Sequence, residues 1–388
     1  MWIGACASTI GTFVQQFAQS WLVYDLTKDP FYLGLDLFLG QLPIITLSLF
    51  GGVFADRMDR RKMLLGSQYI QMVCAFLLAL LFWIHVVKVW HILTLSFVVG
   101  VGQSFGGPAY SALLPNLVDP EDLSNAIAMN SIQFNLARIL GPTIGGLAYA
   151  TLGATWCFTL NGISYIAVIA SLFAIHVKFV PPKSSQRVLT SMHEGIRFIR
   201  RRAGMSALVL LAFCITLFGF SVNGFLPVFV QTVFHRGPET YTLLLVSSGA
   251  GSICGALTVA ALDKMKGLGR LTLLILIGLG IATIGFSLSH WLPLSCFLLF
   301  LSGAAMMASA SLMLSLAQLI STDAMRGRVM SVYNVAFRGG IPLGSLALGK
   351  LIPVFGVSLA LAGSGVMLLL VTLYFFVATP DIFLAPAA

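Results

Sequence analysis

The chain alternates long apolar stretches with short polar connections along nearly its whole length. Each stretch is close to or above the roughly 20 residues that a helix needs to cross a bilayer. In lipid such a stretch must be helical, because an unpaired backbone group finds no water to bond. The pattern predicts an all-α membrane protein with twelve transmembrane helices over residues 2–24, 31–55, 63–84, 92–115, 124–150, 155–177, 205–233, 241–262, 271–289, 293–320, 328–350 and 357–378.

The amino-acid composition supports this prediction and excludes several classes of function. Of the 388 residues 58% are hydrophobic and only 9% are charged, whereas soluble domains carry about 25% charged residues. A soluble enzyme and a nucleic-acid binder are therefore excluded, although the net charge is +9. The six cysteines are scattered through apolar segments, and there is no acidic cluster or Walker pattern. We therefore expect neither a metal nor any other cofactor, and no ATP drive.

The distribution of Lys and Arg predicts the topology. Sixteen of the 22 basic residues fall in the connections after the second, fourth, sixth, eighth and tenth segments. The opposite side has only Lys28, Lys88, Arg236 and Lys350. The positive-inside rule places the side with sixteen in the cytoplasm, so both termini are expected there. We expect a multi-pass protein of a bacterial-type cytoplasmic (inner) membrane.

One long connection divides the chain into residues 1–178, a linker over 179–204 and residues 205–388. In the linker, apolar residues recur at helical spacing at Val188, Met192, Ile196 and Ile199. The spacing predicts an amphipathic helix on the inner membrane surface, held by anionic lipid. A solvated linker is the alternative.

The two halves repeat at an offset of 200 residues. Ser131, Arg138 and Pro142 correspond to Ser331, Arg338 and Pro342. Two six-helix halves of the same orientation, with binding sites where they meet, are typical of transporters. The repeat therefore predicts two pseudo-symmetric halves.

Three groups of motifs carry a resemblance to a known family. The stretch GGVFADRMDRRK, residues 51–62, resembles the loop signature of the major facilitator superfamily. GPTIGG resembles the end of the antiporter motif of proton-driven exporters, with its small residues and proline at Gly141, Pro142, Gly145 and Gly146. SWLVYDLT, PAYSALLPNLV, NAIAMNS and RGRVMSVYN look like the transmembrane secretion effector branch, which includes the enterobactin exporter.

The resemblance implies a major facilitator fold and a cytoplasmic gate between its halves. In the family, the Asp and first Arg of the loop signature form this gate near the start of the eleventh helix. Carried over to this sequence, the gate comprises Gly52, Asp56, Arg57, Arg60, Arg61, Arg326 and Arg328.

Polar residues within the apolar segments indicate the transport path, because such residues are costly in a membrane. They share helix faces, which predicts a substrate cavity lined by Thr12, Gln15, Gln19, Asn135, Arg138, Asn223, Asn334 and Arg338. Hydrogen bonding between helices, without substrate contact, is the alternative. Asp36 is the candidate for proton coupling; an ionised Asp in an outer vestibule is the competing interpretation.

These observations predict a secondary active transporter, not an enzyme. We expect a proton-coupled exporter of a small amphipathic or anionic molecule, siderophore or drug-like, that works by alternating access. An uptake symporter or lysolipid flippase on the same fold is the alternative; a non-transporting receptor is disfavoured. The expected partners are the substrate, protons and membrane lipids, but no nucleic acid, and we expect a monomer.

Overall fold

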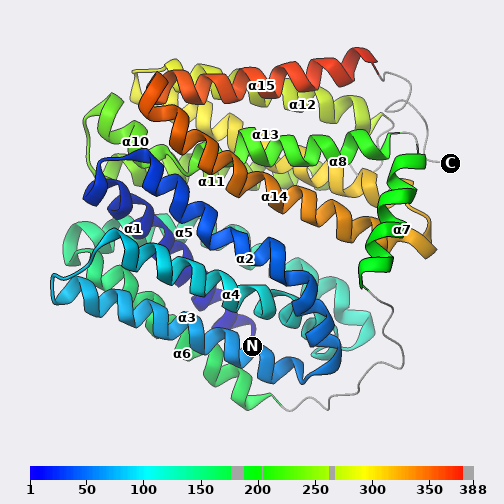
Figure 1. Ribbon diagram of the computed structural model, residues 1–388, viewed down its shortest axis with the longest axis horizontal. Coiled ribbons are helices and arrows are strands. Elements are labelled where there is room, and N and C mark those ends of the chain that lie inside the picture. The colour runs from blue at the N-terminus through cyan, green and yellow to red at the C-terminus, as the bar shows by residue number, and fades with distance from the viewer. Residues whose placement is uncertain (176–187, 203, 262–266, 379–388) are drawn as a thin grey trace. The chain divides into compact units, whose positions relative to one another are not determined.

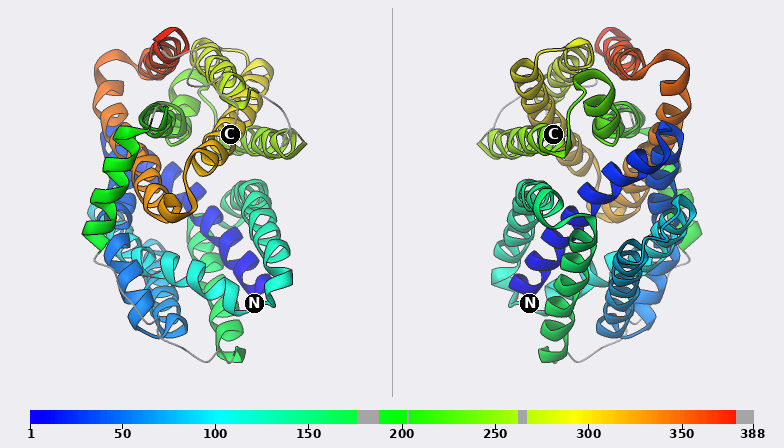
Figure 2. Two further views of the ribbon diagram at one scale, coloured as in Figure 1. Left: turned by 90° about the vertical axis from the view of Figure 1, so that its right-hand side faces the viewer. Right: turned by 90° about the vertical axis from the view of Figure 1, so that its left-hand side faces the viewer.

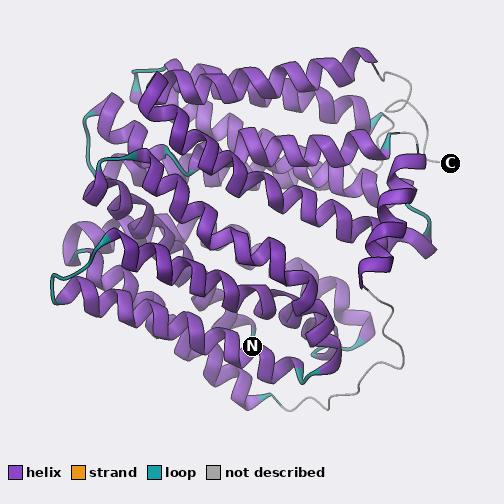
Figure 3. Cartoon of the chain, in the orientation of Figure 1, coloured by secondary structure: helices purple, strands orange, loops and turns teal. Residues whose placement is uncertain are grey.

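The computed structural model describes residues 1–175, 188–202, 204–261 and 267–378 (Figure 1). In these ranges the regular structure is helical throughout (Figure 3). The chain folds as two compact units. The first comprises Met1–Ser185 with Gly237–Thr242, and the second comprises Gln186–Arg236 with Leu243–Ala388.

The first unit is a bundle of six long helices. Helix α1 packs against both α5 and α6 (Figure 2), α2 packs along α4, and α3 contacts α4 and α6. The elements are α1 (Trp2–Thr27), α2 (Pro30–Arg57), α3 (Arg60–Trp83), α4 (Val89–Leu113), η1 (Leu114–Asn116), η2 (Pro120–Asp122), α5 (Leu123–Leu152) and α6 (Ala154–Ala174).

Local sequence signals define where these helices begin and end. The side chain of Asp29 accepts a hydrogen bond from the Phe31 amide, and Pro30 follows it at the first helical position. Asp59 caps α3 in the same way. Both residues satisfy amide groups that a helix start leaves unpaired. Gly153 has a φ of 86°, which suits glycine and lets the chain turn sharply from α5 into α6.

The second unit has long helices of similar length and several shorter elements. Its elements are α7 (Val188–Arg201), α8 (Met205–Cys214), η3 (Ile215–Phe220), α9 (Ser221–Asn223), α10 (Leu226–Phe229), η4 (Val230–Phe234), α11 (Pro238–Ala261), α12 (Leu268–Leu288), α13 (Leu292–Ile320), α14 (Asp323–Phe355) and α15 (Val357–Ala378). Elements η3 and η4 are π-helical. The segment 205–233, expected to be one helix, is divided by η3, by a turn at residues 224–225 and by η4; such π segments are frequent at functional sites.

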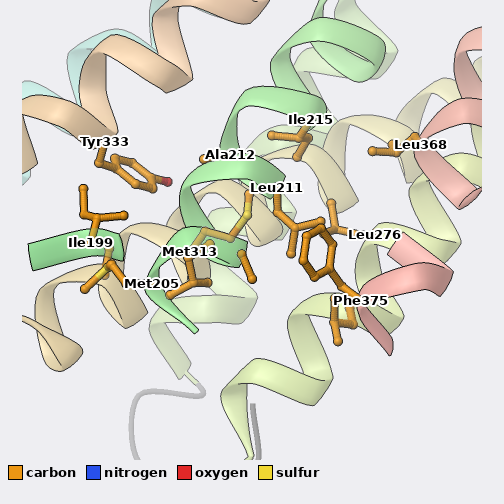
Figure 4. Close-up of a cluster of buried hydrophobic side chains, with 14 of the residues drawn as sticks. Ile199, Met205, Leu211, Ala212, Ile215, Leu276, Met313, Tyr333, Leu368 and Phe375 are labelled. Atoms are coloured by element: carbon orange, nitrogen blue, oxygen red, sulfur yellow. The ribbon is translucent and has the colours of Figure 1, made fainter. Parts of the chain in front are cut away.

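An apolar core holds the second unit together. Buried side chains from α7, α8, η3, α12, α13, α14 and α15 meet in one cluster that includes Leu211, Ile215, Met313 and Leu368 (Figure 4). Tyr333 contributes its ring to this cluster.

Ten helices in the described part of the chain are long and apolar enough to cross a membrane. These ten spans establish a multi-pass membrane protein. Helices α1 and α5 are long enough but are not among the ten. Their polar residues, such as Gln15 and Gln16 in α1 and Asn135 and Arg138 in α5, lower their hydropathy. The twelve-span arrangement stays a prediction.

Candidate functional site

Asp36 is buried at the meeting point of three helices in the first unit. Its side chain on α2 is only 4% exposed. Ser96 on α4 donates its hydroxyl to Oδ1 of Asp36. Gln19 on α1 donates its Nε2 to Oδ2 of Asp36 and to Oγ of Ser96, both at 2.8 Å. No Lys, Arg or His in the described ranges forms an ion pair with Asp36. Neutral donors alone therefore hold this carboxyl group.

A chain of amide side chains leads from Asp36 to α6. Gln15 Nε2 donates to Gln19 Oε1 at 3.4 Å, and Asn161 Nδ2 on α6 donates to Gln15 Oε1 at 2.7 Å. Gln15 and Asn161 are buried, at 9% and 2% exposure. The chain Asp36–Gln19–Gln15–Asn161, which we call the amide chain, thus links α2, α1 and α6.

A second buried polar group lies between α1, α3, α4 and α6. The Tyr165 hydroxyl donates to Gln71 Oε1 at 3.1 Å, and Gln103 Nε2 donates to the same oxygen at 3.1 Å. Thr12 Oγ1 is 3.3 Å from the Tyr165 hydroxyl. Of the predicted cavity residues, Gln19 thus bonds Asp36, Gln15 bonds Gln19, and Thr12 lies beside Tyr165.

Sequence reasoning missed five of these polar partners. They come from α3, α4 and α6, namely Gln71, Ser96, Gln103, Asn161 and Tyr165. Each is a polar side chain within an apolar segment, and that signal was available. A stripe of polar residues along one helix does not single these residues out, because each partner helix contributes only one or two of them.

Helix α5 carries polar atoms without partners. Nη1 of Arg138 and Oδ1 of Asn135 are buried and have no hydrogen-bond partner in the described part of the chain. The Arg138 guanidinium lies 5.7 Å from the ring centroid of Phe134, within cation–π range. Nδ2 of Asn135 donates to the Ser131 carbonyl of its own helix. Neither residue contacts Asp36 through a hydrogen bond or ion pair.

In the second unit, Asn334 and Arg338 on α14 are exposed. Within the described ranges neither side chain forms a hydrogen bond or an ion pair. Asn223 on α9 is half-buried and is the third residue after the π segment η3. The predicted cavity residues of this unit are therefore not linked to one another.

The structure describes the side chains of some of the predicted gate residues. The side chains of Gly52, Asp56 and Arg57 lie outside the described residues. Arg60 donates to the Ala112 carbonyl at 3.0 Å. Arg61 donates to the Leu172 carbonyl at 2.7 Å and to the Phe173 carbonyl at 3.0 Å. These two arginines thus cap the carboxyl ends of α4 and α6, where cations are favoured.

Arg326 and Arg328 lie at the start of α14 in the second unit. Nη1 of Arg328 is 2.7 Å from Oε2 of Glu194 on α7. Arg326 is exposed. The ion pair joins α7 to the beginning of α14.

The glycines of the antiporter-like motif form a packing surface on α5. A Cβ at Gly141 would collide with Phe13 of α1, and one at Gly145 would lie 3.1 Å from Phe17. Gly146 faces Thr242, near the start of α11. Pro142 lies within the same helix. Small residues here let the helix backbones approach closely.

Comparison with known proteins defines the class. The fold is that of the major facilitator superfamily: a D-xylose-proton symporter of known structure superposes with a TM-score of 0.76 over 98% of both chains, at 13% sequence identity. A family model described as transmembrane secretion effector matches residues 1–382, and the chain belongs to this family of membrane transporters.

Two relatives cover most of the chain. The staphyloferrin A transporter of Staphylococcus aureus is 24% identical over 371 residues, which span 95% of this chain and 92% of the relative. The enterobactin exporter of Escherichia coli is 27% identical over 372 residues, 92% of this chain and 87% of the relative.

Proposed function

We propose that this transporter is a proton-coupled exporter of a small anionic molecule. The observation that carries the proposal is the buried Asp36 carboxyl group, whose hydrogen-bond donors among the described residues are Gln19 and Ser96. The family description, which refers to secretion, supports the outward direction. The name of the enterobactin exporter supports the same direction.

Asp36 is proposed to be the group that takes up and releases the proton. A buried carboxylate without a cation is costly, so such groups tend to become neutral. On protonation, one oxygen of Asp36 changes from acceptor to donor. When the proton is on Oδ2, the oxygen that faces Gln19, the new O–H group can donate to Gln19 Oε1, and the Gln19 amide turns to accept it. The amide chain transmits this rotation to Gln15 and Asn161.

The substrate is proposed to be an anion, bound by arginine. Arg138 has a buried Nη1 without a partner in the described ranges, and the repeat-related Arg338 is exposed on α14. Arginine remains charged when buried and holds carboxylate or catecholate oxygen pairs in a bidentate fork. The names of both relatives, for staphyloferrin A and enterobactin, favour a siderophore.

The rest of the proposed transport cycle is based on the resemblance to the major facilitator superfamily. Twelve helices in two halves rock around the bound substrate in the inner membrane, with both termini in the cytoplasm. Asp56 and Arg57 of the loop signature are proposed as the cytoplasmic gate. The protein is proposed to work as a monomer.

Transport into inverted membrane vesicles tests the proposal. Export corresponds to accumulation of labelled siderophore in the vesicle lumen, driven by an acid-inside proton gradient. We expect Asp36→Asn to reduce gradient-driven accumulation to the level of vesicles without the protein. Exchange of labelled for unlabelled substrate needs no net proton movement and should persist. The matched control is Asp25→Asn, which removes an exposed carboxylate bonded to Lys28 and should leave both rates unchanged.

A second arm of the experiment tests the substrate class. We expect Arg138→Lys and Arg338→Lys to weaken binding of the anionic substrate by about tenfold or more, as loss of a hydrogen bond to a charged group does. A neutral ester analogue should lose less. Equal losses for both ligands would reject the anion assignment but leave proton coupling intact. Wild-type accumulation without a gradient, or normal gradient drive in Asp36→Asn, would reject proton coupling itself.

A further inference from the structure

A groove in the second unit lies between α7, α8 and α14. Its volume is ≈ 360 Å³, within the range of about 300–1,000 Å³ typical of ligand sites. Seven of its nine lining residues are apolar, and the other two are Arg200 and Ser206. Helix α7 crosses α14 here rather than running along it (Figure 1).

The groove is polar at one end and apolar at the other. Arg200 lies at the end of α7, and Ser206 lies at the start of α8. Phe213 is seven residues beyond Ser206, which corresponds to roughly 10 Å along a helix. A ligand that matches the groove therefore has a charged head and an apolar tail.

The charge of the head group follows from Arg200. This side chain is exposed and forms no ion pair with any residue in the described ranges. Arg197, Arg201 and Arg202 are also exposed on the same segment. Such a group of cations near a membrane surface attracts anionic lipid, each contributing about 1 kcal/mol.

The apolar part of the groove is open to its surroundings. Ile196 and Leu210, which line it, are 37% and 47% exposed. In a protein that spans a bilayer, acyl chains are the apolar molecules available at this position in the greatest amount. Charge and apolar length together match a phospholipid.

We propose that this groove binds one anionic phospholipid, with its phosphate at Arg200 and one acyl chain along Val209 and Phe213. The site is independent of Asp36 and of the substrate. Its position gives the lipid a structural effect, because α7 is also joined to α14 by the Glu194–Arg328 ion pair. Gly195 adds a close backbone approach, since a Cβ there would lie 2.7 Å from the Arg328 carbonyl oxygen. A bound lipid would hold the same two helices together.

Native mass spectrometry of the full-length protein, purified in detergent and stripped of lipid, tests this site. The probes are phosphatidylglycerol and phosphatidylcholine with identical acyl chains. We expect one phosphatidylglycerol to be retained in preference to phosphatidylcholine. Arg200→Gln should lower its affinity about fivefold, the equivalent of one surface cation. Arg200→Lys should retain the affinity, and the control Arg197→Gln, a residue outside the groove lining, should change it less.

Two further measurements separate the groove from general surface charge. Ala336→Leu fills the apolar part and should reduce binding of both lipids. Glycerophosphoglycerol, the head group without chains, should bind at least tenfold more weakly than the intact lipid; this measurement needs no variant and holds even if Ala336→Leu fails to fold. Equal affinity for both lipids, equal losses in Arg197→Gln and Arg200→Gln, or full binding of the head group alone would overturn the proposal.

Discussion

The buried polar side chains of the two units bond in different ways. In the first unit, buried polar side chains bond one another across helices, as in the pairs Gln19–Asp36, Asn161–Gln15 and Tyr165–Gln71. In the second unit, buried hydroxyls mostly bond a carbonyl of their own helix, as Thr283 and Thr372 do. The second core is an apolar cluster that connects six helices (Figure 4).

This difference in bonding suits the two units to different roles. A polar network can respond to a proton, because a change at one member alters which neighbour donates and which accepts. A close-packed apolar core responds to volume and not to charge. The first unit therefore contains the proposed proton-sensitive machinery, and the second contains a rigid packing surface beside η3. Three pairs of substitutions test this contrast.

The largest effect is expected where α14 packs on η3. A Cβ at Gly340 would collide with Thr216 and lie 2.5 Å from the Phe213 carbonyl oxygen, whereas at Gly339 the nearest atom is 3.9 Å away. We expect Gly340→Ala to lower the free energy of unfolding by about 3 kcal/mol and Gly339→Ala to be neutral or stabilising. Thermal unfolding of both purified variants measures this. Similar stability of the two variants would show that α14 does not pack as described.

An intermediate effect is expected from the amide chain. Gln15→Leu and Asn161→Leu each leave a buried partner unsatisfied, so each should cost about 1–2 kcal/mol of unfolding free energy. The double variant should cost less than the sum, with a coupling of about 0.6–1.7 kcal/mol, the range for hydrogen bonds between membrane helices. A double-mutant cycle in mixed micelles measures this coupling. Strict additivity would mean that the two amides do not interact.

The smallest effect is expected to have opposite signs in the two units. The Tyr165 hydroxyl bonds Gln71, whereas the Tyr333 hydroxyl is buried without a partner in the described ranges. Tyr165→Phe should therefore destabilise by about 1 kcal/mol, and Tyr333→Phe should stabilise by about the same amount. Unfolding of the two variants under identical conditions provides the comparison. A loss of stability in Tyr333→Phe would indicate a partner for that hydroxyl.

Much of the helical organisation was predictable, because each apolar stretch can be recognised from the order of residues along the chain. Residues 2–24 and 357–378 became helices α1 (Trp2–Thr27) and α15 (Val357–Ala378). The segment 205–233 deviated: it contains the π segments η3 and η4, and α14 approaches η3 closely at Gly340 and Gly344. The place of Asp36 within an apolar segment was visible in the sequence, but its burial and its bonds to Ser96 and Gln19 were not.

The sequence by itself determined that the chain is a helical membrane protein, because hydrocarbon forces each long apolar segment to satisfy its own backbone. The loop signature and the glycines of α5 determined the family. Only the tertiary structure decided which polar side chains meet. Gln15 bonds Asn161 of α6, and Arg61 bonds carbonyls at the end of the same helix. The physical reason is that hydropathy is a property along the chain, whereas a side chain's partner depends on how each helix is rotated and packed against its neighbours.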